Sequence, residues 1–390
     1  MNEPLRVAMV ESVGGHRGNE SWLFNLCSGL HQRGCAVQLF TSDETTYPSG
    51  RSLPFDLRLT YKNIYGNENK FLRGLRYLNG GLKSARIAAS GETRIAHAHL
   101  YHFAMREYLN ARLFTNRKMK LVTTVHDVED FIRYGSQVDS KSYRKFERIT
   151  DSAIVHSNYA KERLLQHYSS THPDDIAVTP LPDYDSLYDN PSLSKADARK
   201  QLGLSQNDFI VLFFGQIKKV KGVDVLIKAF ARFDNRHAKL LIAGIPWKVA
   251  EADYTGLVEK EIISDRTILH LRYHPAEMKH VYFRAADVAV LPYREIFSSG
   301  VLVNALYYGT PLVTSDKPLF KEYLTDGHDC LMFENENVES LAAAMTKICN
   351  DADLLASLGQ NAQRTFAKTF TADKAAELTK AVYDRVLERS

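Results

Sequence analysis

The sequence predicts an α/β protein built from two doubly wound domains, each with a parallel sheet covered by helices. Short apolar runs alternate with amphipathic helical stretches along both halves, which is the pattern of parallel sheets with helices on both faces. The chain has 390 residues, more than one hydrophobic core usually serves. Residues 179–191 are rich in Pro, Asp and Asn, as linkers are. We therefore expect domains at 1–182 and 192–370.

The elements follow in order. The first strand is expected at 6–10, and a glycine-rich loop then leads into a helix at 19–33 that ends at Gly34. Further strands of the first half are expected at 37–41, 95–100, 121–125 and 153–156. Strands of the second half are expected at 209–214, 239–243, 267–271, 287–291 and 311–314. A helical pattern at 372–388 ends the chain.

Composition excludes several classes of protein. Hydrophobic content of 44% and charged content of 25% are typical of a globular chain, and a net charge of +4 is too small to indicate a nucleic-acid partner. The four cysteines lack metal-ligand spacing, which favours a reduced, cytoplasmic setting. No signal peptide and no spanning run of roughly 18 apolar residues is visible. Any membrane contact is therefore expected to be peripheral.

One basic segment, 58–86, interrupts the alternation. It carries seven Lys or Arg residues against a single acid, Glu68, and its leucines and Phe71 fall close to helical spacing, although three glycines weaken the helix. Such a segment can lie on an anionic membrane surface. It can equally be a solvated helix that covers the core of the first domain. Both interpretations stay open from the sequence.

The stretch 209–222 is the most informative. Six apolar residues end at Gly215, and lysines follow at 218, 219 and 221 before Gly222 and another helical run. A buried strand that ends in glycine places this loop at the carboxyl edge of a parallel sheet, where open α/β sheets bind ligands. Lysines there suit a polyphosphate, because the ammonium group acts as a point charge. The alternative is a solvated basic turn.

A second block, 291–311, places a helix opening at the same edge. Ser298 or Ser299 can cap a helix that begins near Gly300 and ends at Gly309. The free amides of Ser299, Gly300 and Val301 form an anion site together with the helix dipole. Asn304 lies one turn further, on the face of Gly300, and can reach a sugar hydroxyl attached to a bound phosphate. With the lysines, this predicts a diphosphate site.

These elements together resemble the family 4 glycosyltransferases. The matching pieces, in order, are Gly14-Gly15, 124–127, 151–161, 214–222, 291–300, 309–314 and 322–327. The resemblance implies the GT-B architecture, two Rossmann-like domains facing across a cleft, with the helix at 371–390 packing back on the first. It also implies a retaining transferase that moves a sugar from a nucleotide diphosphate-sugar, with no metal and no further cofactor.

The donor residues carry over by position. Lys221 takes the place of the family's phosphate lysine, in the loop that opens at Gly215. Gln216 stands where an arginine is usual, so Lys218 is expected to supply the second cation. The second glutamate of the family's pair falls on Asn304. Since charged hydrogen bonds are worth about 1.5–3 kcal/mol against about 1 for neutral ones, we expect donor binding to be weaker by roughly tenfold.

The first glutamate of that pair falls on Ile296, with Glu295 one position away as a catalytic candidate. In the first domain, His126 and Asp127 follow the strand at 121–125, and the resemblance places them beside the donor sugar. Retaining transfer in this family uses the leaving phosphate to accept the acceptor's proton. His126 is thus expected to position and to act electrostatically. A histidine that satisfies loop carbonyls is the alternative.

Loop 14–18 supplies the remaining predicted contacts. Gly15 is expected at the donor, His16 at the acceptor or at a phosphate, and Arg17 at the acceptor. The acceptor is expected to be a glycan or lipid-linked saccharide, in surface polysaccharide or glycoconjugate synthesis. His97 and His99 bracket a strand end and are interpreted as packing residues, since no third ligand has the spacing of a zinc site.

Three other functions fit the sequence less well. A catalytically silent homologue that binds nucleotide sugar or serves as a partner subunit would explain Gln216 and Asn304. A sugar-nucleotide epimerase would need acid and base side chains around the sugar that the sequence does not supply as a set. A nicotinamide dehydrogenase is disfavoured, because Gly14–Gly18 lacks the GxGxxG spacing.

Overall fold

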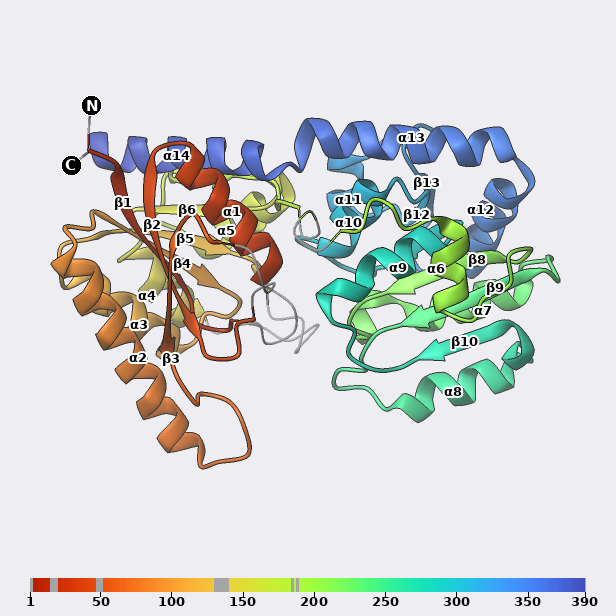
Figure 1. Cartoon of the computed structure of the whole chain (residues 1–390), viewed down its shortest axis with the longest axis horizontal. Coiled ribbons are helices and arrows are strands. Elements are labelled where there is room, and N and C mark those ends of the chain that lie inside the picture. Colours follow the sequence, from red (N-terminus) through yellow and green to blue (C-terminus); the bar gives the residue numbers. More distant parts are fainter. Residues whose placement is uncertain are drawn as a thin grey trace. The chain divides into compact units, whose positions relative to one another are not determined.

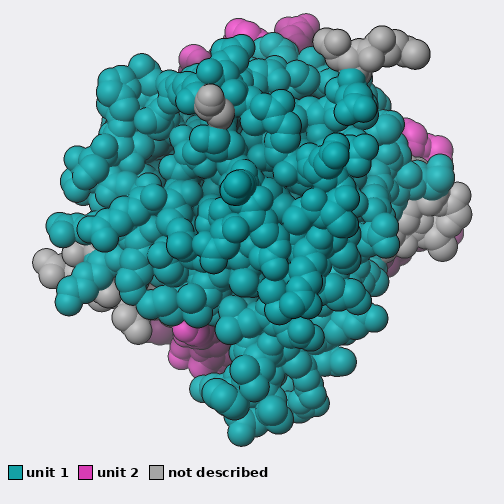
Figure 2. All heavy atoms as spheres, turned by 90° about the vertical axis from the view of Figure 1, so that its left-hand side faces the viewer, with its two compact units in different colours: residues 1–182, 371–390 teal, residues 183–370 magenta. Residues whose placement is uncertain are grey.

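The structure, a computed structural model, describes residues 3–14, 20–46, 52–129, 140–183, 186 and 189–389. The chain forms two compact units (Figures 1 and 2). Unit 1 comprises Met1–Pro182 with Thr371–Ser390, and unit 2 comprises Asp183–Phe370. The predicted contacts Gly15, His16 and Arg17 lie outside the described residues.

Unit 1 is built on a seven-stranded sheet in the order β3-β2-β1-β4-β5-β6-β7, in which every pair is parallel. Its strands are β1 (Leu5–Glu11), β2 (Cys35–Ser42), β3 (Asp56–Tyr61), β4 (Ile95–Leu100), β5 (Lys120–Val125), β6 (Ser152–Val155) and β7 (Ile176–Val178). All six residues of β4 are buried, including His97 and His99. The strand order reverses between β1 and β4.

Helices cover this sheet: α1 (Glu20–Gln32), α2 (Lys70–Ser90), α3 (Met105–Thr115), α4 (Ser140–Glu147), α5 (Asn158–His167), a 3₁₀ turn η2 (Pro173–Asp175) and α14 (Ala372–Glu388). The final helix packs along α1 and also contacts β5 and β6 (Figure 1). Gly29 permits the close approach, because a Cβ there would lie 2.8 Å from the Cβ of Ala376. Arg33 adds an ion pair of 2.7 Å to Asp373.

The close packing of helix α2 on its neighbours explains why the basic segment contains adjacent glycines. A Cβ on Gly80 would lie 2.9 Å from the carbonyl oxygen of Thr60 in β3, and one on Gly81 would lie 1.9 Å from Oδ1 of Asn110 in α3. These glycines are therefore required for close packing, although they lower the intrinsic helix propensity. The hydroxyls of Thr60 and Ser84, 2.7 Å apart, join the helix to the strand.

The apolar stripe of α2 is divided between core and solvent. Its buried residues run from Tyr77 to Ala88 and pack on β3 and α3. Phe71, Leu72 and Leu75, in its first turns, are exposed by 71%, 47% and 49%. Helix α2 therefore covers the core of unit 1 through its later turns, from Tyr77 on, and not through its first turns.

Unit 2 has a six-stranded parallel sheet in the order β10-β9-β8-β11-β12-β13. Its strands are β8 (Phe209–Phe214), β9 (Ala238–Ala243), β10 (Thr267–His270), β11 (Val288–Leu291), β12 (Leu312–Ser315) and β13 (Leu331–Phe333). The strand order reverses between β8 and β11. Ligands bind to open α/β sheets at such a switch point, beyond the carboxyl ends of the strands.

The helices of unit 2 are α6 (Lys195–Gln201), α7 (Val223–Arg232), α8 (Glu251–Lys260), α9 (Lys279–Ala285), α10 (Gly300–Tyr308), α11 (Pro318–Tyr323), α12 (Val338–Asn350) and α13 (Ala352–Thr369), with 3₁₀ turns η3 (Lys219–Lys221), η4 (Ser264–Arg266) and η5 (Ala276–Met278). Helix α7 contacts α12, and α10 contacts both α9 and α13. Buried apolar side chains from β8, β9 and α7 form much of the core.

The predicted fold class is confirmed: both units are α/β and both sheets are parallel. Strands β3, β7 and β13 were not predicted. The last two have three residues each, too short for a periodic signal, and β3 lies partly within the basic segment. No helix among the described residues is long and apolar enough to cross a membrane.

Candidate functional site

The candidate site lies at the switch point of unit 2, where β8 and β11 end side by side. Beyond β8, the chain passes through Gly215, at a φ of +110°, and the 3₁₀ turn η3, which ends at Gly222 with a φ of +65°. Beyond β11, the segment 292–299 leads into α10. Both glycines adopt positive φ values that side chains disfavour, so these turns depend on glycine.

The two segments touch each other. The backbone amide of Arg294 donates to the carbonyl of Val220 at 2.8 Å. A Cβ on Gly222 would lie 1.9 Å from the carbonyl oxygen of Pro292, and one on Gly215 would lie 3.0 Å from Cγ2 of Val301. The lysine turn and the start of α10 therefore converge on one place.

Arg294 stabilises this arrangement through contacts that no local sequence pattern predicts. Its guanidinium donates to both carboxylate oxygens of Asp224, at 2.9 and 2.8 Å, and to Glu336 at 2.6 Å. It also donates to the carbonyl of Lys219 at 2.6 Å. Burial would raise the pKa of Asp224, but its hydrogen bonds with Arg294 bring that pKa below the ordinary value. The pair joins the loops after both strands to α7.

Lys221 lies over an aromatic ring. Its Nζ is 3.6 Å from the ring centroid of Tyr293, which is buried. Cations are attracted to such ring faces, so the ring holds the ammonium group at the switch point. Lys218 precedes the same turn and is partly exposed, as is Gln216.

The amino end of α10 has the properties of an anion site. Ser299 caps the helix, its Oγ accepting from the amide of Leu302 at 3.2 Å, and the first turn carries no acidic side chain. The amides of Gly300 and Val301 have no partner within the helix, as in any first turn. Ser298 precedes the cap and is partly exposed.

Asn304 is the unusual residue of this helix. It is 3% exposed, and its Oδ1 has no hydrogen-bond partner among the described residues. A buried polar atom without a partner costs free energy. It is therefore a candidate ligand contact one turn inside the helix.

Glu295 is held by its surroundings. Its Oε1 accepts from the amide of Ile296 at 3.0 Å, and its Oε2 lies 3.5 Å from Nζ of Lys317. Lys317 occupies the N-cap position of α11 without a side-chain capping bond, and it was not predicted. The carboxylate is thus paired, and Lys317 adds a cation near the end of β12.

In unit 1, His126 follows β5 and is 6% exposed. Its Nδ1 lies 3.1 Å from His156 and its Nε2 lies 3.2 Å from His99, so both ring nitrogens contact other histidines. Burial lowers its pKa well below 6.5, which keeps the ring neutral. Asp127, the next residue, is partly exposed.

Comparison with known proteins agrees with this geometry. The family described as "Glycosyl transferases group 1" matches residues 194–365, and "Glycosyltransferase Family 4" matches residues 17–182. The chain belongs to the family 4 glycosyltransferases. The matches cover both units, including the turn at 218–222 and helix α10.

Relatives of this glycosyltransferase have low sequence identity. A D-inositol 3-phosphate glycosyltransferase of Corynebacterium aurimucosum is 24% identical, covering 92% of this chain and 91% of the relative. The enzyme of the same name from Gordonia bronchialis is 24% identical, with 99% and 89% covered. The chain is therefore a transferase.

Solved structures share the GT-B fold. Sucrose-phosphate synthase of Thermosynechococcus elongatus has a TM-score of 0.76 at 20% identity, over 99% of this chain and 100% of that one. HepE of Anabaena, in complex with UDP and glucose, has a TM-score of 0.73 at 17% identity, over 98% and 100%. The predicted fold class, two Rossmann-like units with parallel sheets as in GT-B glycosyltransferases, is confirmed.

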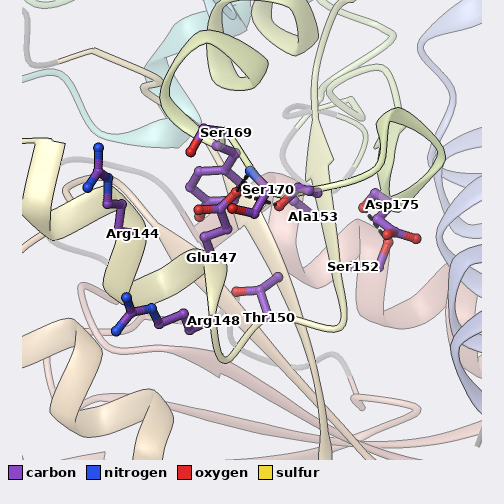
Figure 3. A pocket seen from close by; sticks show the side chains of 11 residues that line it. Arg144, Glu147, Arg148, Thr150, Ser152, Ala153, Ser169, Ser170 and Asp175 are labelled. Carbon is purple, nitrogen blue, oxygen red and sulfur yellow. Dashed lines mark hydrogen bonds between the residues drawn. The ribbon is translucent and has the colours of Figure 1, made fainter.

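Unit 1 contains a pocket at the amino ends of its strands, away from His126. Its volume is about 480 Å³, and Figure 3 shows its lining from the end of α4, the start of β6 and the loop before η2. Glu147 accepts there from the amide of Ser170 at 2.6 Å and from Thr171 at 3.1 Å. The pocket is at the amino end of β6, whereas His126 and His156 lie at carboxyl ends of strands.

No group of three or more His, Cys, Asp or Glu side chains in the described part of the chain is arranged to hold a metal ion. The site of unit 2 instead offers ammonium groups and helix amides.

Proposed function

We propose that unit 2 binds a nucleotide diphosphate-sugar and that the enzyme transfers the sugar with retention of configuration, without a metal. The observation that carries the proposal is the convergence of the Lys221 turn and the start of α10 at the switch point of the sheet. Two lysines and the helix amides would neutralise the leaving diphosphate, which is the task of a metal in other transferases.

The proposed step needs no strong protein base. The bond from the anomeric carbon to the phosphate oxygen breaks, the acceptor oxygen bonds to that carbon on the same face, and the acceptor's proton passes to the leaving phosphate. Glu295, paired with Lys317, would orient the sugar, and Asn304 would accept a hydrogen bond from a ribose hydroxyl. His126 and Asp127 would serve to position the reactants.

A thermal-shift panel of UDP, GDP, ADP and their glucose conjugates tests the donor site. We expect UDP to stabilise most, because the similar HepE structure contains UDP and glucose. Ligand at a hundred times its dissociation constant adds about 2.7 kcal/mol of stability. If no nucleotide shifts the melting temperature, the donor assignment is wrong.

For the acceptor, we propose a glycan or lipid-linked saccharide of surface polysaccharide or glycoconjugate synthesis. Exposed apolar residues of α2 and α3 support this proposal, since they offer a surface to lipid. They are Phe71, Leu72, Leu75, Met105 and Leu109. An inositol phosphate is the second candidate, favoured by the names of the relatives. Transfer assays with both acceptors and UDP-glucose, read by mass spectrometry of the product, discriminate the two.

A peripheral membrane contact through residues 58–86 belongs to the same proposal. Exposed cations flank the apolar turns of α2, as anionic lipid requires: Lys62, Lys70, Lys83 and Arg86.

Co-sedimentation with phosphatidylcholine vesicles, with and without phosphatidylglycerol, measures the contact. The triple variant F71S/L72S/L75S should lose binding to the anionic vesicles. The control Ile262→Ser, at a residue of unit 2 that is 87% exposed, should not. Equal binding of both variants would contradict the proposal.

The second candidate function is a catalytically silent homologue that binds nucleotide sugar. The observation that favours it is the absence of an arginine at Gln216 and of a carboxylate at Asn304. Calorimetry followed by a hydrolysis assay separates the two functions. Binding of UDP-glucose with neither hydrolysis nor transfer would favour the silent homologue.

A further inference from the structure

Three buried histidines of unit 1 form a continuous hydrogen-bonded chain. His99 Nδ1 lies 3.2 Å from His126 Nε2, and His126 Nδ1 lies 3.1 Å from His156 Nε2. The chain ends at a backbone group, because His156 Nδ1 lies 2.9 Å from the carbonyl oxygen of Thr179. His99 belongs to β4, while His126 and His156 follow β5 and β6. Neighbouring strand ends thus bring together residues that are far apart in sequence.

The carbonyl determines where every proton sits. A carbonyl oxygen only accepts, so His156 must carry its proton on Nδ1. A neutral imidazole has one donor and one acceptor, so His156 Nε2 accepts from His126 Nδ1–H. His126 Nε2 in turn accepts from His99 Nδ1–H. The remaining nitrogen of His99, Nε2, is then bare and faces Sδ of Met9 at 3.0 Å. A thioether is only a weak acceptor, so a proton donated to it would stabilise less than the one that His156 donates to the carbonyl of Thr179.

Burial keeps the chain neutral. Desolvation lowers the pKa of His156 to about 4 and the pKa values of His99 and His126 well below 6.5. The opposite proton order would need a second proton on His156, because its Nδ1 still has to donate to Thr179. Such a buried cation is disfavoured.

Aromatic rings fix the plane of the central imidazole. The ring of Tyr101 stacks on His126 with centroids 4.5 Å apart and an angle of 9°, and Trp22 meets His126 edge-on at 4.9 Å. The backbone amide of His126 donates to the carbonyl of Leu100 at 2.9 Å. Ring, backbone and both ring nitrogens are therefore all constrained.

We propose that His156, together with His99, is a positioning residue that fixes the Nδ1–H tautomer and the ring plane of His126. The hydrogen-bonded histidines thereby hold the turn that carries Asp127 at the carboxyl end of β5. Its consequence for sugar transfer rests on the proposed function, whereas the proton order does not.

Nitrogen NMR of protein labelled with ¹⁵N-histidine tests the proton order directly. Two-bond nitrogen–proton spectra distinguish a protonated ring nitrogen from a bare one, and single His→Gln variants assign the signals. We expect His99, His126 and His156 each to be protonated at Nδ1 and bare at Nε2 at pH 7. A His126 protonated at Nε2, or doubly protonated, would overturn the proposal.

Kinetics test the positioning role. Glutamine at 156 can accept from His126 and donate to Thr179, whereas leucine can do neither. His156→Leu should lower kcat by about tenfold or more with little change in the donor KM, since small misplacements carry large rate penalties. His156→Gln should restore most of the rate, and the exposed control His102→Leu should leave it unchanged.

The outcomes test the proton order and the positioning role separately. Equal losses in the Gln and Leu variants, both folded by circular dichroism, would show that His156 acts through ring packing and would overturn the positioning role. If His156→Leu fails to fold, the NMR spectra of the native protein still test the proton order, and the rate of the Gln variant still tests the positioning role. If the native protein transfers no sugar, the proposed function fails, while the NMR spectra alone still decide the proton order.

Discussion

Lys221→Ala is the most direct test of the proposed donor site. The substitution removes the ammonium group that lies 3.6 Å above the ring of Tyr293. We expect two effects of different size. A charged hydrogen bond to phosphate is worth about 1.5–3 kcal/mol, which corresponds to a loss of UDP affinity of roughly 10- to 150-fold. The lost contact with the ring costs about 0.5–2 kcal/mol of folding stability, so the unliganded protein should stay folded.

Isothermal titration with UDP measures the affinity, and chemical denaturation of the unliganded protein measures the stability. Lys219→Ala is the matched control, because Lys219 lies in the same 3₁₀ turn, carries the same charge and is exposed. We expect the control to retain affinity within about threefold, since exposed charges contribute little. Equal losses in both variants would mean that net charge, and not the position of Lys221, attracts the nucleotide. Unchanged affinity in Lys221→Ala would refute the phosphate assignment.

Three further predictions concern stability and binding. Asn304→Leu should weaken UDP binding by roughly fivefold, which corresponds to a neutral hydrogen bond of about 1 kcal/mol. It should not lower the unfolding free energy of the unliganded protein, because Oδ1 has no hydrogen-bond partner among the described residues. A drop in that free energy would contradict the assignment of Asn304 as a ligand contact. Gly203→Ala, at a φ of +68° in open space, should cost about 1–2 kcal/mol in urea unfolding. Gly222→Ala should cost clearly more, because its Cβ would lie 1.9 Å from a carbonyl oxygen, and equal costs would contradict the packing. Burial lowers the pKa of His156 to about 4 and that of His97 to about 3, from 6.5. The unfolded state therefore binds protons below pH 6.5 that the native state does not, so stability should fall as the pH falls from 6.5 to 4, by up to roughly 1 kcal/mol per pH unit for each histidine. If the unfolding free energy, measured by denaturation at each pH, does not change over this range, these imidazoles take up protons in the native state as readily as in the unfolded state.

Local patterns predicted the sheets and the two loops of the candidate site well. Strand β8 has an apolar run closed by glycine, and α10 has a serine cap and a glycine end, so their bounds are visible in the sequence. The features that were missed depend on contacts between distant residues. Arg294 meets Asp224 across 70 positions and Glu336 across 42, and no local pattern marks such pairs.

The histidine chain was missed for the same reason. Its links span 27 and 30 positions, and the separate motifs that contain His99, His126 and His156 give no sign that strand order brings them together. Helix α2 shows a different limit. Gly80 and Gly81 were interpreted as weakening the helix, whereas the lack of a side chain lets the helix approach β3 and α3. An adjacent pair of glycines within a helical pattern can therefore signal close packing.

The pairing of α1 with α14 has a consequence for biosynthesis. Unit 2 is one continuous stretch, Asp183–Phe370, while unit 1 combines Met1–Pro182 with Thr371–Ser390. During translation the second half can thus finish folding while the first half still lacks the helix that covers α1. Nascent chains that stop before residue 371 would present that uncovered apolar surface to chaperones and proteases. Quality control can in this way discard a truncated product even though unit 2, with its candidate site, is complete.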